Sequence, residues 1–297
     1  MGSHLAEALC ARGAEVTVLD NLSSGSRENL PRGVGFMEGD ICDRALVHKL
    51  VRTTDWVFHL AAQPSVPFSI EHPEQTHREN LDAVLAFLCE CRDAKVQRFV
   101  FSSSCSVYGD CSSPATEADP APPLSPYALQ KYAAERYVQM FHQFYGMPGV
   151  ALRYYNVFGP RQSFHSPYSG VIARFCDALL DGKEPVIFGT GEQSRDFVSV
   201  HDVVRANLAA AETEAAAGAV FNIATGASTS VLELLRTLNR VHDSDIQPRF
   251  EPARPGEIMN SRADISAARH VLNFEPQVSL EEGLRETLEY YRNHRSK

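Results

Sequence analysis

Two short stretches carry side chains whose types and spacing suit proton transfer. FSSSCSVYG (101–109) ends an apolar run in three serines, and SPYALQKYAAE (125–135) places Tyr127 four residues before Lys131. Residues i and i+4 of a helix share a face, so the phenol and the ammonium project side by side. A nearby cation stabilises phenolate and lowers the tyrosine pKa towards the range of a general base. Ser104, at the end of the preceding strand, can reach the same substrate oxygen as Tyr127. The pattern therefore predicts a site that removes a proton from a carbinol beside a dinucleotide.

The first twenty residues fit the second half of a dinucleotide-binding loop. VTVLD (16–20) ends in Asp20, 18 residues after Gly2. In such folds a carboxylate about 20 residues past the glycine-rich turn binds the adenosine ribose. We therefore expect Gly2 to be the third loop glycine, with the first strand and two glycines lying before Met1 and the start codon assigned too far downstream. The alternative is that MGSH is the scar of an expression tag and Asp20 merely ends a strand.

The elements that must position these residues alternate between strand and helix. Apolar, β-branched runs predict strands over 16–20, 33–40, 56–62, 98–104 and 149–156. Apolar residues at helical spacing predict helices over 43–52, 76–93 and 126–145. Such alternation implies an α/β fold, a doubly wound parallel Rossmann-type sheet, here with a smaller C-terminal α+β substrate domain. We expect an N-terminally truncated dinucleotide-binding domain over 1–160, joined by some later segments, and a mainly substrate-binding domain over 161–297.

The composition argues against several classes of partner. The formal net charge of -9 argues against nucleic acid. No apolar run is long enough to span a membrane and no secretory signal opens the chain, so a cytoplasmic protein is expected. Seven scattered cysteines without a CxxC pair, and histidines without HExxH, predict neither a disulfide framework nor a metal site.

Taken in order, the motifs resemble those of a known family, the extended short-chain dehydrogenases that act on nucleotide sugars. They are VTVLDNLSSG, GDI, HLAA, FSSSCSVYG, SPYALQKYAAE, LRYYNVFGPRQ, EQSRDFV and RPGE. The resemblance covers almost the whole chain from Gly2. Within that family the chain is most similar to the UDP-sugar 4-epimerases, especially the group acting on UDP-N-acetylglucosamine.

The resemblance implies a role for each matching position. The catalytic residues would be Ser104, Tyr127 and Lys131. The residues implied to bind NAD are Gly2, Asp20, Asn21, Asp40, Ile41, Leu60, Ala61, Asn80, Tyr127, Lys131 and Tyr154. The residues implied to bind a UDP-sugar are Ser104, Asn156, Arg195, Arg254 and Ser261, with Arg161 assisting at the diphosphate. A homodimer through the helices near 76–93 and 126–145 is also implied.

The implied reaction is oxidation of the sugar at C4 and return of the hydride to the other face of a 4-keto intermediate. Related dehydratases and decarboxylases usually carry an acid directly after the catalytic Ser or Thr, where this chain has Cys105 and Ser106, so simple epimerisation is favoured. By the same resemblance, Ser261 stands at the position beside the sugar 2-substituent, where a tyrosine would exclude an N-acetyl group and a serine leaves room for it. UDP-GlcNAc and UDP-GalNAc are therefore expected substrates beside UDP-Glc and UDP-Gal. The remaining alternative is a non-catalytic relative that binds a nucleotide sugar without NAD.

Overall fold

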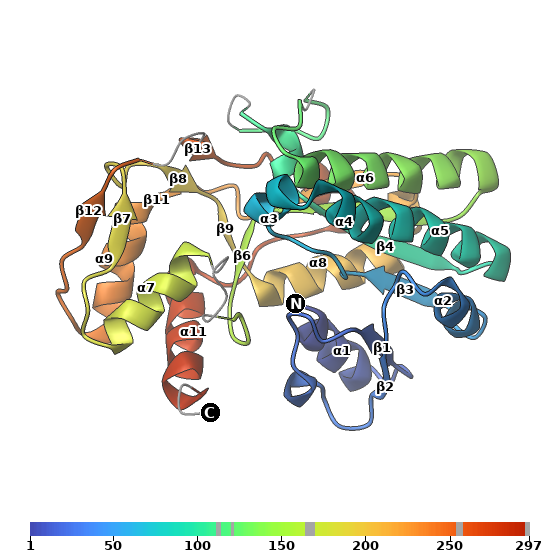
Figure 1. Ribbon diagram of the computed structural model, residues 1–297, viewed down its shortest axis with the longest axis horizontal. Coiled ribbons are helices and arrows are strands. Elements are labelled where there is room, and N and C mark those ends of the chain that lie inside the picture. Colours follow the sequence, from blue (N-terminus) through green and yellow to red (C-terminus); the bar gives the residue numbers. More distant parts are fainter. Residues whose placement is uncertain (111–113, 120–121, 164–169, 254–257, 295–297) are drawn as a thin grey trace.

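The computed structural model describes residues 1–110, 114–119, 122–163, 170–253 and 258–294 (Figure 1). Its main sheet has four parallel strands in the order β10-β5-β4-β3. Their bounds are β3 (Trp56–His59), β4 (Arg98–Ser104), β5 (Gly149–Tyr154) and β10 (Val220–Ile223). The parallel, helix-covered sheet of Rossmann type that the sequence predicts is confirmed.

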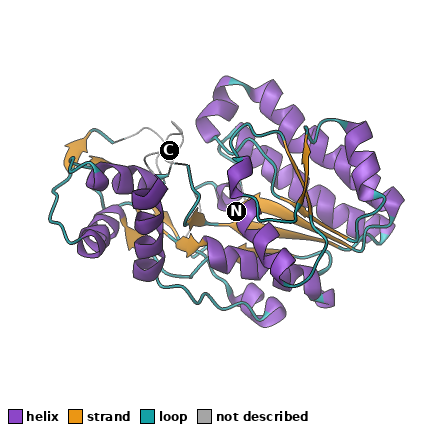
Figure 2. Ribbon diagram, turned by 90° about the horizontal axis from the view of Figure 1, so that it is seen from below, coloured by secondary structure: helices purple, strands orange, loops and turns teal. Residues whose placement is uncertain are grey.

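Helices cover both faces of this sheet (Figure 2). One face is covered by α2 (Arg44–Val51), α5 (Ala83–Ala94) and α6 (Pro126–Tyr145). The other is covered by α8 (Val200–Glu212) and α10 (Ser266–Leu272), with α1 (Gly2–Ala11) packed on α8.

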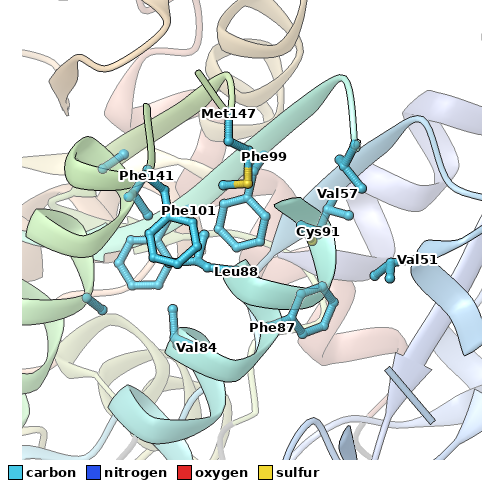
Figure 3. Packing of buried hydrophobic residues seen from close by; sticks show 14 of the residues in the cluster. Val51, Val57, Val84, Phe87, Leu88, Cys91, Phe99, Phe101, Phe141 and Met147 are labelled. Atoms are coloured by element: carbon cyan, nitrogen blue, oxygen red, sulfur yellow. The ribbon is translucent and has the colours of Figure 1, made fainter. Parts of the chain in front are cut away.

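Strand β4 supplies both cores, because successive side chains of a strand point to opposite faces. Phe99 and Phe101 join the core beneath α5 and α6, where they pack with Phe87 (Figure 3). Val100, between them, joins the core on the α8 side. A strand buried on both faces must be apolar throughout, as the run RFVF is.

Strands β1 (Thr17–Asp20) and β2 (Gly35–Glu38) form a separate parallel pair. In the part of the chain that the structure describes, no strand pairs with β3 on the side away from β4.

A smaller lobe is built from the second half of the chain (Figure 1). Its helices are α7 (Val171–Leu180), α9 (Val231–His242) and α11 (Leu280–His294). Its strands are β7 (Val186–Phe188) paired with β12 (Arg249–Glu251), and β8 (Ser194–Arg195) between β11 (Thr229–Ser230) and β13 (Asn260–Ser261). The parallel pair β6 (Asn156–Phe158) and β9 (Phe197–Ser199) lies between the two lobes. After residue 160, α8 and β10 return to the main sheet.

The helix predicted over 76–93 differs from the structure. It consists of α4 (Pro73–His77), a π-helical turn η2 (Arg78–Asp82) and α5, and it is preceded by α3 (Val66–Glu71), which periodicity did not predict. A π turn holds one extra residue, so it shifts the side chains that face inwards. Short 3₁₀ turns are η1 (Arg27–Asn29), η3 (Cys105–Tyr108) and η4 (Glu214–Ala216). Within the described residues, no helix combines the length and the apolar character that crossing a bilayer requires.

Candidate active site

Ser104 and Tyr127 come together at the carboxyl edge of the main sheet. Ser104 is the last residue of β4, and Tyr127 lies in the first turn of α6. That helix begins where the sequence says it should: Ser125 is the N-cap, its Oγ accepts the amide of Ala128, and Pro126 opens the helix with its fixed φ.

The Ser104 hydroxyl is oriented by the backbone two residues further along the chain. Its Oγ caps η3 by accepting the amide N–H of Ser106 at 3.2 Å. A side-chain hydrogen bond also joins Ser104 to Tyr127 and opposes the rise in the tyrosine pKa. The Ser104 hydroxyl therefore contacts the Ser106 amide and the Tyr127 phenol at once, which fixes its position at the end of β4.

Burial governs the protonation of Tyr127 and Lys131. The two side chains are 8% and 3% exposed. Burial raises the pKa of Tyr127 to about 12 and lowers the pKa of Lys131 to about 7. The lowered tyrosine pKa predicted from the i, i+4 spacing is therefore wrong for this state, because loss of solvent disfavours the phenolate and the ammonium alike.

The ammonium of Lys131 is held by strand β4. Its Nζ donates to the carbonyl of Ser102 at 2.7 Å and lies 4.8 Å from the centroid of the Phe101 ring. Both partners belong to β4, so the strand that ends in Ser104 also fixes the lysine. The same strand and helix thus orient all three predicted catalytic side chains.

A buried ion pair anchors this corner, and the sequence analysis did not single it out. Glu135, one turn after Lys131, accepts from Arg153 at 2.6 and 2.9 Å and from the hydroxyl of Ser103 at 2.9 Å. The guanidinium also lies over the ring of Tyr108. The sequence did contain a sign of this ion pair, because each partner is a charged residue within an otherwise apolar pattern. Glu135 lies on the inner face of a helix, and Arg153 lies inside an apolar strand.

Polar groups suited to an adenosine collect at the ends of β1 and β2. Asp20 Oδ1 accepts the amide of Leu22 at 2.7 Å, and Asn21 Nδ2 donates to Asp40 Oδ2 at 3.0 Å. The amide of Cys42, with Asn21 assisting, lowers the pKa of Asp40. A Cβ on Gly25 would lie 3.2 Å from Asp20 Oδ2, so the loop passes close to that carboxylate. The carboxylates of Asp20 and Asp40 can accept hydrogen bonds from the ribose hydroxyls of NAD, and they would repel the 2′-phosphate of NADP.

The other predicted cofactor residues lie at several places in the main domain. Those near the end of a strand or the start of α1 are Gly2, Ile41, Leu60 and Ala61. Asn80 lies in the π turn and hydrogen-bonds Gln63 in the loop after β3. The ring of Tyr154 is buried on the α8 side of the sheet, and its hydroxyl donates to Asn207 Oδ1 at 2.9 Å. Only the backbone of Tyr154 therefore remains for a ligand at that edge.

Three of the predicted substrate residues lie on adjoining strands. Arg195 in β8 pairs with Ser261 in β13. The backbone and side-chain amides of Asn156 donate to the carbonyl of Asp196 at 3.0 and 3.3 Å. The buried Asp196 carboxylate accepts from Thr225 at 2.6 and 2.8 Å, which fixes β8 against the end of the main sheet. Arg254 lies outside the described residues.

The structure places Arg161 against α1. Its guanidinium donates to Glu7 Oε2 at 2.8 Å and to Ser3 Oγ at 3.3 Å, and its backbone is left-handed, with φ 65°. These contacts hold the side chain against α1, and its part at the substrate diphosphate stays a prediction.

Comparison with known proteins places this geometry among proteins of one family. Residues 1–224 match the NAD dependent epimerase/dehydratase family. A UDP-glucose 4-epimerase from Mycolicibacterium smegmatis is 39% identical over 301 residues, which cover 99% of this chain and 96% of that protein.

Two solved structures are similar over nearly their whole length. UDP-glucose 4-epimerase from Thermotoga maritima, solved with UDP-glucose, has a TM-score of 0.94 at 41% identity and covers 98% of this chain and 95% of its own. UDP-N-acetylglucosamine 4-epimerase from Methanobrevibacter ruminantium, in complex with UDP-N-acetylmuramic acid, has a TM-score of 0.94 at 41% identity and covers 98% and 94%.

Proposed function

The chain belongs to the NAD-dependent epimerase/dehydratase family, and from this premise we propose that it inverts C4 of a UDP-sugar through a transient 4-keto intermediate. The observation that carries the proposal is the buried contact between Ser104 and Tyr127, with Lys131 one turn further along α6. The named activities of the two relatives solved with UDP-sugars support the same substrate class.

Each catalytic side chain has a distinct task. Tyr127, as phenolate, accepts the proton of the sugar 4-hydroxyl, and the Ser104 hydroxyl donates to the same oxygen. The charge of Lys131 offsets the cost of a buried phenolate. The 4-keto sugar then presents its other face, and Tyr127 returns the proton to O4. Bound NAD would supply reversible hydride transfer at C4 of the sugar, so no external reductant would be consumed.

The cofactor is NAD. Asp20, Asn21 and Asp40 hold its adenosine half, and the loop that begins at Leu60 and Ala61 lines the rest. Two carboxylates at the adenosine end favour NAD over NADP, because a 2′-phosphate would meet like charge.

The substrate lies between the two lobes. Arg195, with Arg254, binds the diphosphate, for which a planar guanidinium is suited. Asn156 contacts the sugar side of the diphosphate, and Ser261, paired with Arg195 across β13 and β8, lies beside the 2-position of the sugar. The small side chain admits both the N-acetyl sugars and the plain hexoses.

Elimination chemistry is disfavoured at this site. A dehydratase needs an acid that protonates a leaving hydroxyl, and η3 offers Cys105 and Ser106 directly after Ser104. The intact catalytic residues also argue against a relative that only binds a nucleotide sugar.

The working unit is a homodimer in the cytoplasm. Helix α6 carries an exposed apolar stripe of Leu129, Met140 and Phe144, of a kind that marks protein–protein contact. The buried thiols of Cys91 and Cys176 are unbridged, which suits a reducing compartment.

Removal of the Tyr127 hydroxyl tests the reaction. We expect Tyr127→Phe to lower kcat for UDP-Gal to UDP-Glc conversion by about 10²- to 10⁴-fold, because the general base is lost. The NAD released on denaturation should remain unchanged. Tyr132→Phe, one turn further along α6, is the matched control and should stay active. Wild-type activity in Tyr127→Phe would contradict the assignment, and a 4-keto-6-deoxy product from the wild type would point to a dehydratase.

Substrate choice tests the role of Ser261. Ser261→Tyr should abolish turnover of UDP-GlcNAc and UDP-GalNAc but spare UDP-Gal, because the ring fills the space beside the 2-substituent. Conversion of all four UDP-sugars is followed by chromatography. An equal loss for both kinds of sugar would rule out this selectivity.

A further inference from the structure

One segment presses against the catalytic end of α6. It runs from Gln63 through α3, α4 and the π turn η2, and all three elements contact α6. Figure 1 shows α3 and α4 alongside the start of that helix. The segment begins in the loop after β3 that the proposed function assigns to NAD.

Gln130 of α6 makes hydrogen bonds to two residues of this segment. It lies three residues after Tyr127 and one before Lys131, and it is 3% exposed. Its Oε1 accepts from Asn80 Nδ2 at 3.0 Å, and its Nε2 donates to Thr76 Oγ1 at 3.0 Å. A buried amide satisfied at both ends is held in one orientation, since rotation would break both hydrogen bonds.

Asn80 carries the connection on to the cofactor loop. Its Oδ1 accepts the backbone amide of Gln63 at 2.8 Å, and its Nδ2 donates to the carbonyl of the same residue at 3.0 Å. The extra residue of the π turn allows Asn80 to face inwards, and such turns recur at functional sites. A chain of side-chain and backbone groups thus joins the loop after β3 to α6.

A second contact reaches the catalytic tyrosine itself. The hydroxyl of Ser69 in α3 is fully buried, donates to the carbonyl of Val66 at 2.7 Å and accepts the backbone amide of Tyr127 at 3.1 Å. The first turn of α6 is therefore tied to the same segment at two points, Tyr127 and Gln130.

We propose that Gln130 is a positioning residue that, with Asn80 and Thr76, fixes Tyr127 and Lys131 relative to the loop that binds the nicotinamide half of NAD. The proposal rests on the proposed function. The network holds the phenol at the distance from C4 that hydride and proton transfer require. Small displacements of reacting groups lower rates steeply.

The test replaces Gln130 by a side chain of similar length without polar ends. Gln130→Met should lower kcat about 10- to 100-fold while KM for the UDP-sugar stays nearly unchanged, because the substrate contacts lie elsewhere. The acid limb of the kcat pH profile should shift to higher pH, because a displaced Lys131 stabilises the phenolate less. Thr76→Val removes only the acceptor of Gln130 Nε2 and keeps the volume of the side chain. It should lower kcat and shift the acid limb in the same directions, but less than Gln130→Met.

Gln139→Met is the matched control. Gln139 lies on the same helix and donates to the carbonyl of Gly218 at 3.3 Å, outside the site. Its kcat and pH profile should match the wild type. Equal losses in Gln130→Met and Gln139→Met, or an unshifted pH profile in Gln130→Met and Thr76→Val, would overturn the proposal without touching the proposed function.

Hydrogen exchange separates the two hypotheses. In Gln130→Met the backbone amides of Gln63 and Tyr127 should exchange faster than in the wild type, and in Gln139→Met they should not. If the wild type epimerises no UDP-sugar, the proposed function fails. Independently of that outcome, unchanged exchange in Gln130→Met would show that Gln130 does not hold the cofactor loop and the start of α6 together.

Discussion

Tyr127 and Lys131 both tend towards their neutral forms because they are withdrawn from water at the same corner of the sheet. The i, i+4 spacing brings the two groups together but says nothing about their solvation. Burial is the main cause of both pKa shifts, and for Tyr127 the hydrogen bond to Ser104 opposes part of the rise.

The free energy of unfolding of the nucleotide-free protein should depend on pH through Lys131. The pKa of this lysine falls from 10.5 to about 7 on folding. Between these values the unfolded lysine binds a proton that the folded one has lost, so this residue makes the free energy of unfolding rise with pH across that window. Below it both forms are charged, and the full cost of burying the ammonium is present.

Lys131→Met removes this dependence. The gain in the free energy of unfolding relative to wild type should be largest near pH 7 and should shrink towards pH 10. Urea unfolding at a series of pH values measures it, and only the slope is diagnostic, because the lost hydrogen bond to Ser102 adds a constant. Lys49→Met, at an exposed position of α2, is the control. A difference that stays constant with pH would refute the linkage.

At the scale of elements, the approach to α6 depends on one glycine. Gly109 follows η3 with φ 56°, and a Cβ there would lie 2.5 Å from the carbonyl oxygen of Pro122. The residues after Pro122 lead directly into Ser125, the N-cap of α6. The turn after Ser104 and the start of the catalytic helix therefore pack backbone against backbone.

Gly109→Ala should displace that approach. Gly146, at the C-cap of α6, offers a matched control, with φ 66° and nothing within 4 Å of an added Cβ. Gly146→Ala should cost about 1–2 kcal/mol from the left-handed backbone alone. Gly109→Ala should cost a further ~1–3 kcal/mol from overpacking and should also lower kcat. Equal losses in urea unfolding and unchanged kcat would show that the close approach is unimportant.

At the scale of the whole molecule, the residues of the proposed site are divided between two lobes. Ser104 and Tyr127 belong to the main sheet and its helix, whereas Arg195 and Ser261 belong to the three-stranded sheet of the smaller lobe. Asn156 lies where the chain leaves β5 for β6. Such a division suits a long ligand that must be held at one end while its sugar moves at the other.

The apolar stripe of α6 predicts the dimer. Phe144 is 68% exposed there, so Met140→Glu with Phe144→Glu should halve the mass observed by sedimentation velocity. Buried like charges would oppose association, because desolvating unpaired carboxylates is costly. Phe250→Glu, at an equally apolar residue 54% exposed on β12, should leave the mass unchanged. A wild-type monomer, or a double variant of unaltered mass, would exclude this interface.

Local signals of the sequence were sufficient for the main strands and for helix α6. Strand and helix periodicity repeats within a few residues, so β4, β5 and α6 could be predicted with their bounds nearly unchanged. The places of Ser104, Tyr127 and Lys131 on these elements follow from the same periodicity, whereas their catalytic roles stay predictions. The predicted helix over 76–93 failed at the π turn, because the extra residue there is stabilised by Asn80 reaching distant partners rather than by its own sequence pattern.

The partners of buried polar groups could be decided only by the tertiary structure. Glu135 with Arg153, Gln130 with Asn80 and Ser69 with Tyr127 are 18, 50 and 58 residues apart along the chain. The pKa values at the site depend in the same way on which segments exclude water. The sequence by itself determined which elements form and which polar side chains they carry to the carboxyl edge of the sheet. How far each side chain is buried and which groups hold it followed only from packing, because desolvation and long-range hydrogen bonds are properties of the assembled core.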